Sequence, residues 1–345
     1  MDSSKLTRIC VQRVLPHEHD YHESIKHDDK LSAAFWRGKL WPQNSTVTIS
    51  FLDDPTSENT RTPMSALTKI GRNIDPLQDK LTNTPLKEAL KTIIKERIQP
   101  LVNLKLKFIQ DKDTNADIRI TFKDPNASWS LVGTDAIHES AKSGCSDENS
   151  LSNCASMNLG WFDVGTYIHE FGHALGMIHE HQNTSHGGTP IKWNKPKLYS
   201  YMENTQGWDK EQVDTNVIGK YKSDQLNGSK FDPLSVMLYF FPPSLTTNGV
   251  GTKQNFSLSG IDAEWINKSY PGSEQDPKTF YMKAYGKSLD SSIQNSSNLR
   301  SKMSNDEKEK TKSHTKMWIF ISIGILLFLV ILSLILWLTL RNKNT

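Results

Sequence analysis

The sequence is poor in cysteine and carries little net charge. Three cysteines in 345 residues are too few for a fold held together by disulfides, and their odd number leaves at least one thiol without a partner in the chain. The 41 lysines and arginines against 38 aspartates and glutamates give a formal net charge of only +3. Because nucleic-acid binders need a basic surface to neutralise phosphates, this balance predicts no nucleic-acid partner.

The two ends of the chain differ in hydrophobicity. The N-terminus lacks the uninterrupted apolar run and the small-residue cleavage pattern of a secretory signal peptide. Residues 317–340 contain no charged side chain, and as a helix they would extend about 36 Å, enough to cross a bilayer. A buried core helix is the alternative, but it is usually shorter and polar on one face. We therefore expect a C-terminal helix that anchors the chain by a single membrane pass.

The charges beside this segment predict an orientation. Lysines at 308, 310, 312 and 316 precede it, and only Arg341 and Lys343 follow it. Because basic residues collect on the cytoplasmic side of a membrane, we expect the large N-terminal part to face the cytosol.

Shifts in composition divide the chain into five segments. They are a polar N-terminal segment (1–34), a folded domain (35–272), a flexible stalk (273–316), the transmembrane helix (317–340) and a basic tail (341–345). Within the domain, alternating β-branched and apolar residues predict strands at 46–51, 104–109, 117–122 and 156–159. Helical spacing predicts helices at 86–98, capped by Thr84 and Pro85, and at 195–203, 210–221 and 261–270. The expected fold class is α+β or mixed α/β with a helical second half.

The motif with the clearest chemistry is HEFGHALGMIHEH at 169–181. His169 and His173 are four positions apart, so a helix brings both imidazoles to one face, where they can bind one metal ion. Gly176 can adopt the left-handed conformation that ends a helix, and the returning chain then brings His179 to the same ion. Three neutral histidines leave a fourth position for water, as in catalytic zinc sites, with Glu170 as the general base. Surface histidines on an amphipathic helix would not account for the apolar residues around the motif.

This motif resembles the extended zinc signature of metzincin metalloproteases, and Glu180 after the third histidine matches the astacin-like variant. The stretch FDPLSVMLY at 231–239 is similar to the Met-turn of the clan, with Leu238 where related sequences often have histidine. SWSLVGTDA at 128–136 and SMNLGW at 156–161 resemble segments of matrixin-like and astacin-like microbial proteins. The resemblance covers about residues 35–271.

The resemblance implies a fold and a reaction. The metzincin fold has an N-terminal subdomain with a twisted mixed sheet and two long helices, a smaller irregular C-terminal subdomain, and Zn2+ in the cleft between them. Met237 would form a hydrophobic floor below the zinc. Tyr239 would stand near the metal and either donate a hydrogen bond to the oxyanion or bind the zinc in the resting enzyme. The implied activity is that of a zinc endopeptidase, which cleaves a peptide or protein substrate with a water that Glu170 deprotonates. The substrate is expected to pair antiparallel to an edge strand, for which residues 156–159 are the candidate, although the same residues could equally be an ordinary strand end without a role in binding.

Two other functions stay open. One is hydrolysis of a non-peptide ester or amide by the same fold, and the other is a membrane-anchored zinc-binding module without activity. Glu170 argues against the second, because a structural zinc site needs no acid beside an open coordination position. Of the cysteines, only Cys145 and Cys154 are near enough to bridge, and a role of Cys10 in latency lacks a recognisable pro-segment. The oligomeric state is not predicted.

Overall fold

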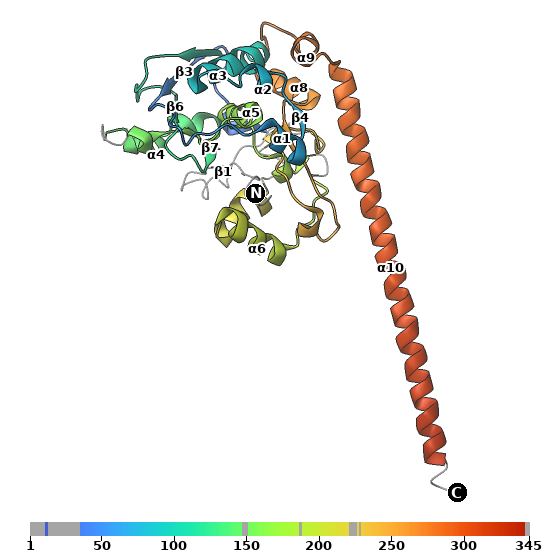
Figure 1. Ribbon diagram of the computed structural model, residues 1–345. Coiled ribbons are helices and arrows are strands. Elements are labelled where there is room, and N and C mark those ends of the chain that lie inside the picture. The colour runs from blue at the N-terminus through green and yellow to red at the C-terminus, as the bar shows by residue number, and fades with distance from the viewer. Residues whose placement is uncertain are drawn as a thin grey trace.

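The computed structural model describes residues 11–12, 35–146, 151–185, 188–220, 226–227 and 229–341, and these form a mixed α/β body (Figure 1). Its main sheet has six strands in the order β1-β7-β8-β6-β3-β5. The strands are β1 (Val11–Gln12), β3 (Thr46–Phe51), β5 (Lys105–Phe108), β6 (Ile118–Thr121), β7 (Ser128–Ser130) and β8 (Met157–Leu159). β7 and β1 run parallel to each other and opposite to the other four strands.

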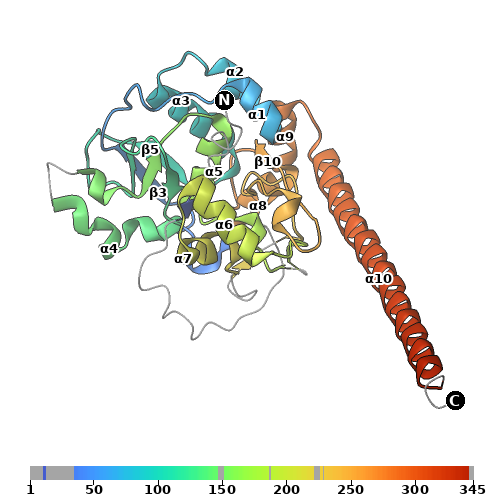
Figure 2. The same cartoon turned by 60° about the horizontal axis from the view of Figure 1, so that its bottom comes forward.

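Of the helices, α5 lies in the middle of the body (Figures 1 and 2). Two short two-stranded sheets pair β4 (Gly71–Ile74) with β10 (Gln254–Phe256) and β2 (Phe35–Trp36) with β9 (Leu226–Asn227). The helices are α1 (Met64–Ile70), α2 (Leu77–Lys80), α3 (Leu86–Ile93), α4 (Glu139–Lys142), α5 (Val164–Ala174), α6 (Lys195–Gln206), α7 (Lys210–Val213), α8 (Gly260–Ser269), α9 (Pro277–Tyr285) and α10 (Leu289–Arg341).

The two largest hydrophobic clusters make up most of the described interior. The larger one joins the sheet to α3, α5 and α8 through fully buried side chains such as Ile49, Ile93 and Phe171. The smaller one joins α6 to the chain after residue 230, and it includes Leu198 and Tyr239. Because α5 belongs to the first cluster and Tyr239 to the second, side chains from both clusters can meet between them.

Most elements expected in the domain are confirmed. The strand at 46–51 and the helix that begins at Lys195 form as predicted, and the helix beginning with Leu86 continues as a π-helical turn to Ile98. The expected cap at Thr84 is wrong by one residue, because Pro85 itself is the N-cap residue and makes no side-chain capping bond. β7 was not predicted, since its serines, Ser128 and Ser130, are buried and hide the alternation of a strand.

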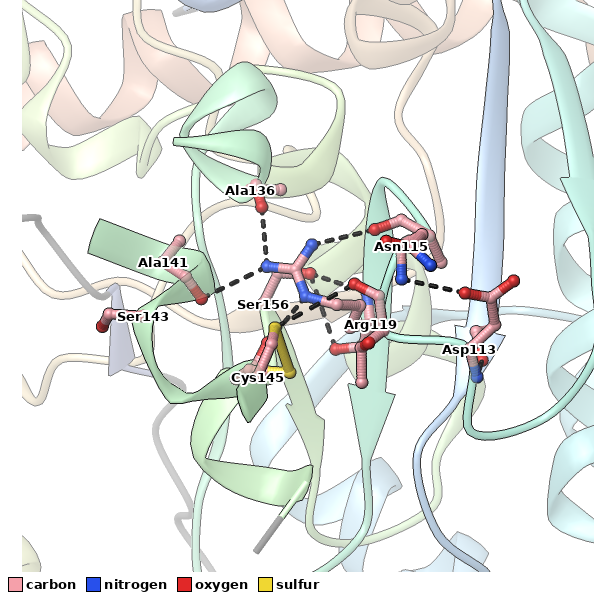
Figure 3. Close-up of a disulfide and its surroundings, with 12 residues drawn as sticks. Asp113, Asn115, Arg119, Ala136, Ala141, Ser143, Cys145 and Ser156 are labelled. Atoms are coloured by element: carbon pink, nitrogen blue, oxygen red, sulfur yellow. Dashed lines mark hydrogen bonds between the residues drawn. A yellow bond between two sulfur atoms is a disulfide. The ribbon is translucent and has the colours of Figure 1, made fainter. Parts of the chain in front are cut away.

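Cys145 and Cys154 form a disulfide, a pairing that the sequence left open (Figure 3). Beside it lies Arg119 of β6, whose buried guanidinium donates hydrogen bonds to the carbonyl oxygens of Cys154, Ala116 and Ala136. These bonds hold the segment that leads into β8 against β6. Cys10 lies outside the described residues.

The C-terminal part differs from the expected flexible stalk. Asp276 and Pro277 start α9, with the Asp276 carboxylate accepting the amides of residues 278 and 279, a capping signal that the polar composition concealed. α10 begins at Leu289 and leads away from the body as one long helix (Figures 1 and 2). Across the part of the chain that the structure describes, no helix has a stretch both long and apolar enough to span a membrane. This finding does not support the transmembrane helix expected at 317–340.

Candidate metal centre

The first two histidines stand on α5, whose position is fixed at both ends. Asp163 caps the helix by accepting the Thr166 amide, and every residue of α5 is buried. The chain then turns at Gly176, whose φ of +99° lies in the left-handed region that favours glycine. His179 follows this turn, so the predicted return of the chain toward α5 is confirmed.

The turn brings three histidines together. One ring nitrogen each from His169, His173 and His179 lies within 4.8 Å of the others, and all three side chains are buried. Nε2 of His173 is 3.1 Å from Nε2 of His179. The spacing of the sequence motif therefore produces one compact group of nitrogen donors.

The other ring nitrogen of each histidine is fixed by a hydrogen bond. The Nδ1 atoms of His169 and His173 lie 2.9 Å and 2.8 Å from the carbonyl oxygens of Val236 and Met177, which can only accept. Nδ1 of His179 lies 3.1 Å from Oε1 of Gln182. Nε2 of His169 is buried without a hydrogen-bond partner among the described residues. Such an orientation leaves the Nε2 atoms for a metal ion, and buried nitrogens of this kind fit zinc.

Burial also selects the protonation state that metals bind. It lowers the pKa of His169 to about 4, and it lowers the pKa values of His173 and His179 well below the usual value, helped by the neighbouring histidines. Neutral imidazole is the metal-binding form of histidine. The three histidines are therefore ready to bind a metal at neutral pH.

The loop Phe231–Tyr239, here called the Met-turn loop, lies against the histidines and α5. Beside supplying the Val236 carbonyl for His169, it places the Met237 sulfur close to Gly172 of α5. The Tyr239 ring is buried, with its centroid 4.2 Å from that of His179 and 5.9 Å from that of His169. The structure thus places Met237 and Tyr239 beside the cluster, as the resemblance implied.

Glu170 follows His169 on α5 and is fully buried. It is therefore part of the same buried helix as two of the histidines. The resemblance gave it the role of the base, and its position next to His169 is compatible with that role.

Two carboxylates hold the Met-turn loop in place: Glu180, which the sequence analysis named without a structural role, and Asp262, which it missed. Glu180 Oε1 accepts the backbone amide of Asp232 at 2.8 Å, and the Asp262 carboxylate accepts the Val236 amide and the Ser235 hydroxyl. Burial and the nearby Asp232 raise the pKa of Glu180 well above its usual value and that of Asp262 to about 7. A polar residue directly after the third histidine was visible in the sequence, but its partner, 52 residues later, was not.

The strand expected to bind substrate is wrong. β8, at the predicted position, lies inside the sheet between β7 and β6, so its edges are already paired. β7 is the strand beyond it, and β1 pairs with its outer side. Because β7 was missed in the sequence, β8 was taken for an edge.

Comparisons with known proteins agree with this site. No family model matches the chain, and no curated protein does. Among solved structures, one of myroilysin is 30% identical with a TM-score of 0.51, and the match covers 70% of this chain and 100% of that one. A crystal structure of myroilysin is 27% identical with a TM-score of 0.40, covering 76% and 100% of the two chains. High choriolytic enzyme 1, a hatching enzyme zinc-protease from Oryzias latipes (medaka fish), is 14% identical with a TM-score of 0.36, covering 70% and 98%.

The assignment to a family rests on the first of these matches, because it is 30% identical and covers the whole myroilysin chain. The grouped histidines at the spacing HExxHxxGxxH supply the donor set that zinc requires. The likeness in fold and the chemistry of the site therefore lead to one conclusion: this chain belongs to the astacin family of metzincin zinc metalloproteases, and it is a metalloendopeptidase.

Proposed function

We propose that His169, His173 and His179 hold the zinc ion and that Glu170 is the general base of peptide hydrolysis. The observation that carries the proposal is the buried histidine cluster, in which the Nδ1 atoms are bonded to the protein and the Nε2 atoms are left for the ion. Glu170 is buried on the same helix, next to the first ligand. No other group of three metal-binding side chains occurs among the described residues.

When bound, zinc supplies Lewis-acid chemistry, polarising the scissile carbonyl and making a water easier to deprotonate. Glu170 takes a proton from this water, whose oxygen forms a bond to the carbonyl carbon. The bond from that carbon to nitrogen then breaks, and Glu170 gives the proton to the leaving amine. The Tyr239 hydroxyl donates a hydrogen bond to the oxyanion that develops between these two events.

Single substitutions test the ligands and the base separately. Replacing any of His169, His173 or His179 by alanine should remove zinc, whereas alanine at the exposed His138 should leave about one zinc per chain. Glu170→Gln should keep the metal and abolish cleavage of a fluorogenic peptide, and Glu203→Gln, at an exposed glutamate of α6, should change neither. Stoichiometric zinc in all three histidine variants, or full activity of Glu170→Gln, would refute the proposed roles. Casein cleavage that a chelator blocks would separate peptide hydrolysis from hydrolysis of other substrates.

The proposal also includes tethering to a membrane by residues 317–340, with the catalytic domain on the cytosolic side. It is supported by the absence of charge in this stretch and by the lysines that precede it. Within α10, the large apolar side chains Ile325, Leu326 and Phe328 are more than half exposed, so no described part of the chain covers them. Protease protection of the catalytic domain in sealed vesicles from the secretory pathway would refute the cytosolic orientation.

A further inference from the structure

One face of α10 lies against the catalytic domain before the helix leads away from the body. The side chains that face the domain are spaced three or four residues apart, as required for one face of a helix. Leu289 is buried in the larger hydrophobic cluster, and the Ser292 hydroxyl accepts the amide of Gly260, the first residue of α8. Met303 packs on the smaller cluster, which contains Tyr239. The segment Leu289–Met303, here called the brace, thus contacts both clusters.

The middle of the brace bonds directly to the Met-turn loop. Ser296 is fully buried, and its hydroxyl donates to Oδ1 of Asp232 at 2.5 Å. One turn later, Arg300 donates from Nη1 to the carbonyl oxygen of Phe231 at 3.0 Å. A buried carboxylate needs donors to offset its loss of water, and Ser296 is one of the two hydroxyls that serve Asp232, the other being Ser259.

Asp232 in turn is bonded to the residue next to a zinc ligand. Its backbone amide donates to Oε1 of Glu180 at 2.8 Å, and the Glu180 amide donates to the carbonyl oxygen of Met237 at 3.0 Å. Glu180 directly follows His179. Because both its side chain and its backbone amide are bonded to the Met-turn loop, these two bonds fix the chain beside the third histidine. The path from α10 to the metal centre is therefore continuous: Ser296, Asp232, Glu180, His179.

We propose that the brace is a working part of the metal centre, and that Ser296 and Arg300 are positioning residues that hold the Met-turn loop and, through Glu180, His179. The inference rests on the proposed role of His179 as a ligand. It means that the catalytic unit extends to about residue 303 rather than ending near 272. It also means that α10, which leads to the proposed anchor, begins with residues that hold the Met-turn loop in place, so it is more than a linker.

The test uses Ser296→Ala in the full chain, with Ser301→Ala as the matched control. Ser301 is on the same helix but exposed, so both variants make the same gain in helix propensity and only one loses the bond to Asp232. We expect Ser296→Ala to speed the transfer of zinc to a chelating dye by about 3- to 10-fold and to lower kcat with KM nearly unchanged. Amide exchange at Asp232 should accelerate as well. Ser301→Ala should match the parent, and Ser296→Thr, which keeps the hydroxyl, should restore slow release.

A second pair of variants tests the brace without changing the Ser296 hydroxyl. Arg300→Met should speed zinc release in the same direction, whereas Lys302→Met, at an exposed position of α10, should not. Parent-like zinc release and parent-like exchange of the Asp232 amide in Ser296→Ala would overturn the inference, even if the melting temperature fell. Equal acceleration in Ser296→Ala and Ser301→Ala would also overturn it. Failure of the histidine assignment would instead show in the zinc content of the histidine variants, whereas exchange of the Asp232 amide reports on the brace alone.

Discussion

A methyl group added at Gly172 perturbs the contact between α5 and the Met-turn loop. Gly172 lies on α5 directly before His173, and a Cβ atom there would be 2.6 Å from the Met237 sulfur and 3.3 Å from the Met177 sulfur. Ordinary contacts between such atoms are about 3.5 to 4 Å, so Met237 would have to retreat by roughly 1 Å. Val236, next to Met237, supplies the carbonyl oxygen that holds His169. The substitution Gly172→Ala therefore acts on the support of the first histidine.

Two opposing terms decide the effect on global stability. Overpacking a filled interior typically costs about 1 to 3 kcal/mol, whereas alanine in place of glycine inside a helix contributes about 1 kcal/mol. The net loss is then about 0 to 2 kcal/mol, and the flexible methionine side chain favours the lower end. The gain in helix propensity stabilises the fold but does nothing to offset the loss of zinc affinity. Displacing a group that hydrogen-bonds to a metal ligand typically weakens metal binding by about 10- to 100-fold, and we expect Gly172→Ala to lose zinc affinity in the lower part of that range.

The two quantities are measured separately on Gly172→Ala. Thermal unfolding should shift by a few degrees at most, since about 1 kcal/mol corresponds to roughly 2 to 4 °C for a domain of this size. Competition with a chelating dye should show the loss of zinc affinity. Gly38→Ala is the control, because Gly38 is exposed and a Cβ there would meet no atom within 4 Å. Unchanged zinc affinity in Gly172→Ala would refute the support of His169 by Met237 and its neighbour.

Three further results are expected. Tyr239→Phe should lower kcat by roughly 100- to 1,000-fold at nearly constant KM, because the lost donor serves the oxyanion and not the bound substrate, and kinetics with a fluorogenic peptide decide this. If kcat of Tyr239→Phe fell by less than about twofold, Tyr239 would have only a packing role. Because the pKa of Asp262 is raised to about 7 in the folded protein, its protonation stabilises the fold at low pH and this contribution is lost as the pH rises from about 4 to 7. In zinc-free protein, urea unfolding should show the stability advantage of the parent over Asp262→Asn shrinking across that range, and a constant difference would contradict the shift. Truncation before Met317 should release an active protein into the supernatant after carbonate washing, and its retention in the membrane pellet would require another anchor.

The metal centre was predictable because its chemistry is local in sequence. His169 and His173 are related by one helical turn, and Gly176 marks the reversal, so elementary helix geometry places the first two histidines and allows the third. Burial of the cluster followed from the apolar residues between the histidines. The nature of the Nδ1 partners could not be derived in the same way, because the carbonyl of Val236 comes from a loop 67 residues away from His169.

The fold was less predictable where local patterns are weak. β7 is only three residues long, and its two serines are buried among hydrogen bonds, so period-two alternation could not identify it. Its omission then changed the interpretation of β8 from an interior strand to an edge. The composition of 273–316 concealed α9 and the start of α10 for a related reason: their polar residues outnumber the few apolar side chains that are buried, such as Phe280 and Leu289.

The boundary of the catalytic unit follows from the buried carboxylates and not from composition. Asp232 is almost fully buried, and its side-chain oxygens are served by Ser259, Ser296 and the Leu234 amide. A chain that ended at 272 would keep two of these donors and would expose the carboxylate where Ser296 now covers it. Because an uncompensated buried charge costs more than an exposed one, such a chain would favour a Met-turn loop that opens toward water at Asp232. That opening would draw the Asp232 amide away from Glu180, and with it the support of the third histidine. A serine in a stretch of ordinary polar sequence is thus tied to zinc binding by the requirement that a buried carboxylate be fully hydrogen-bonded.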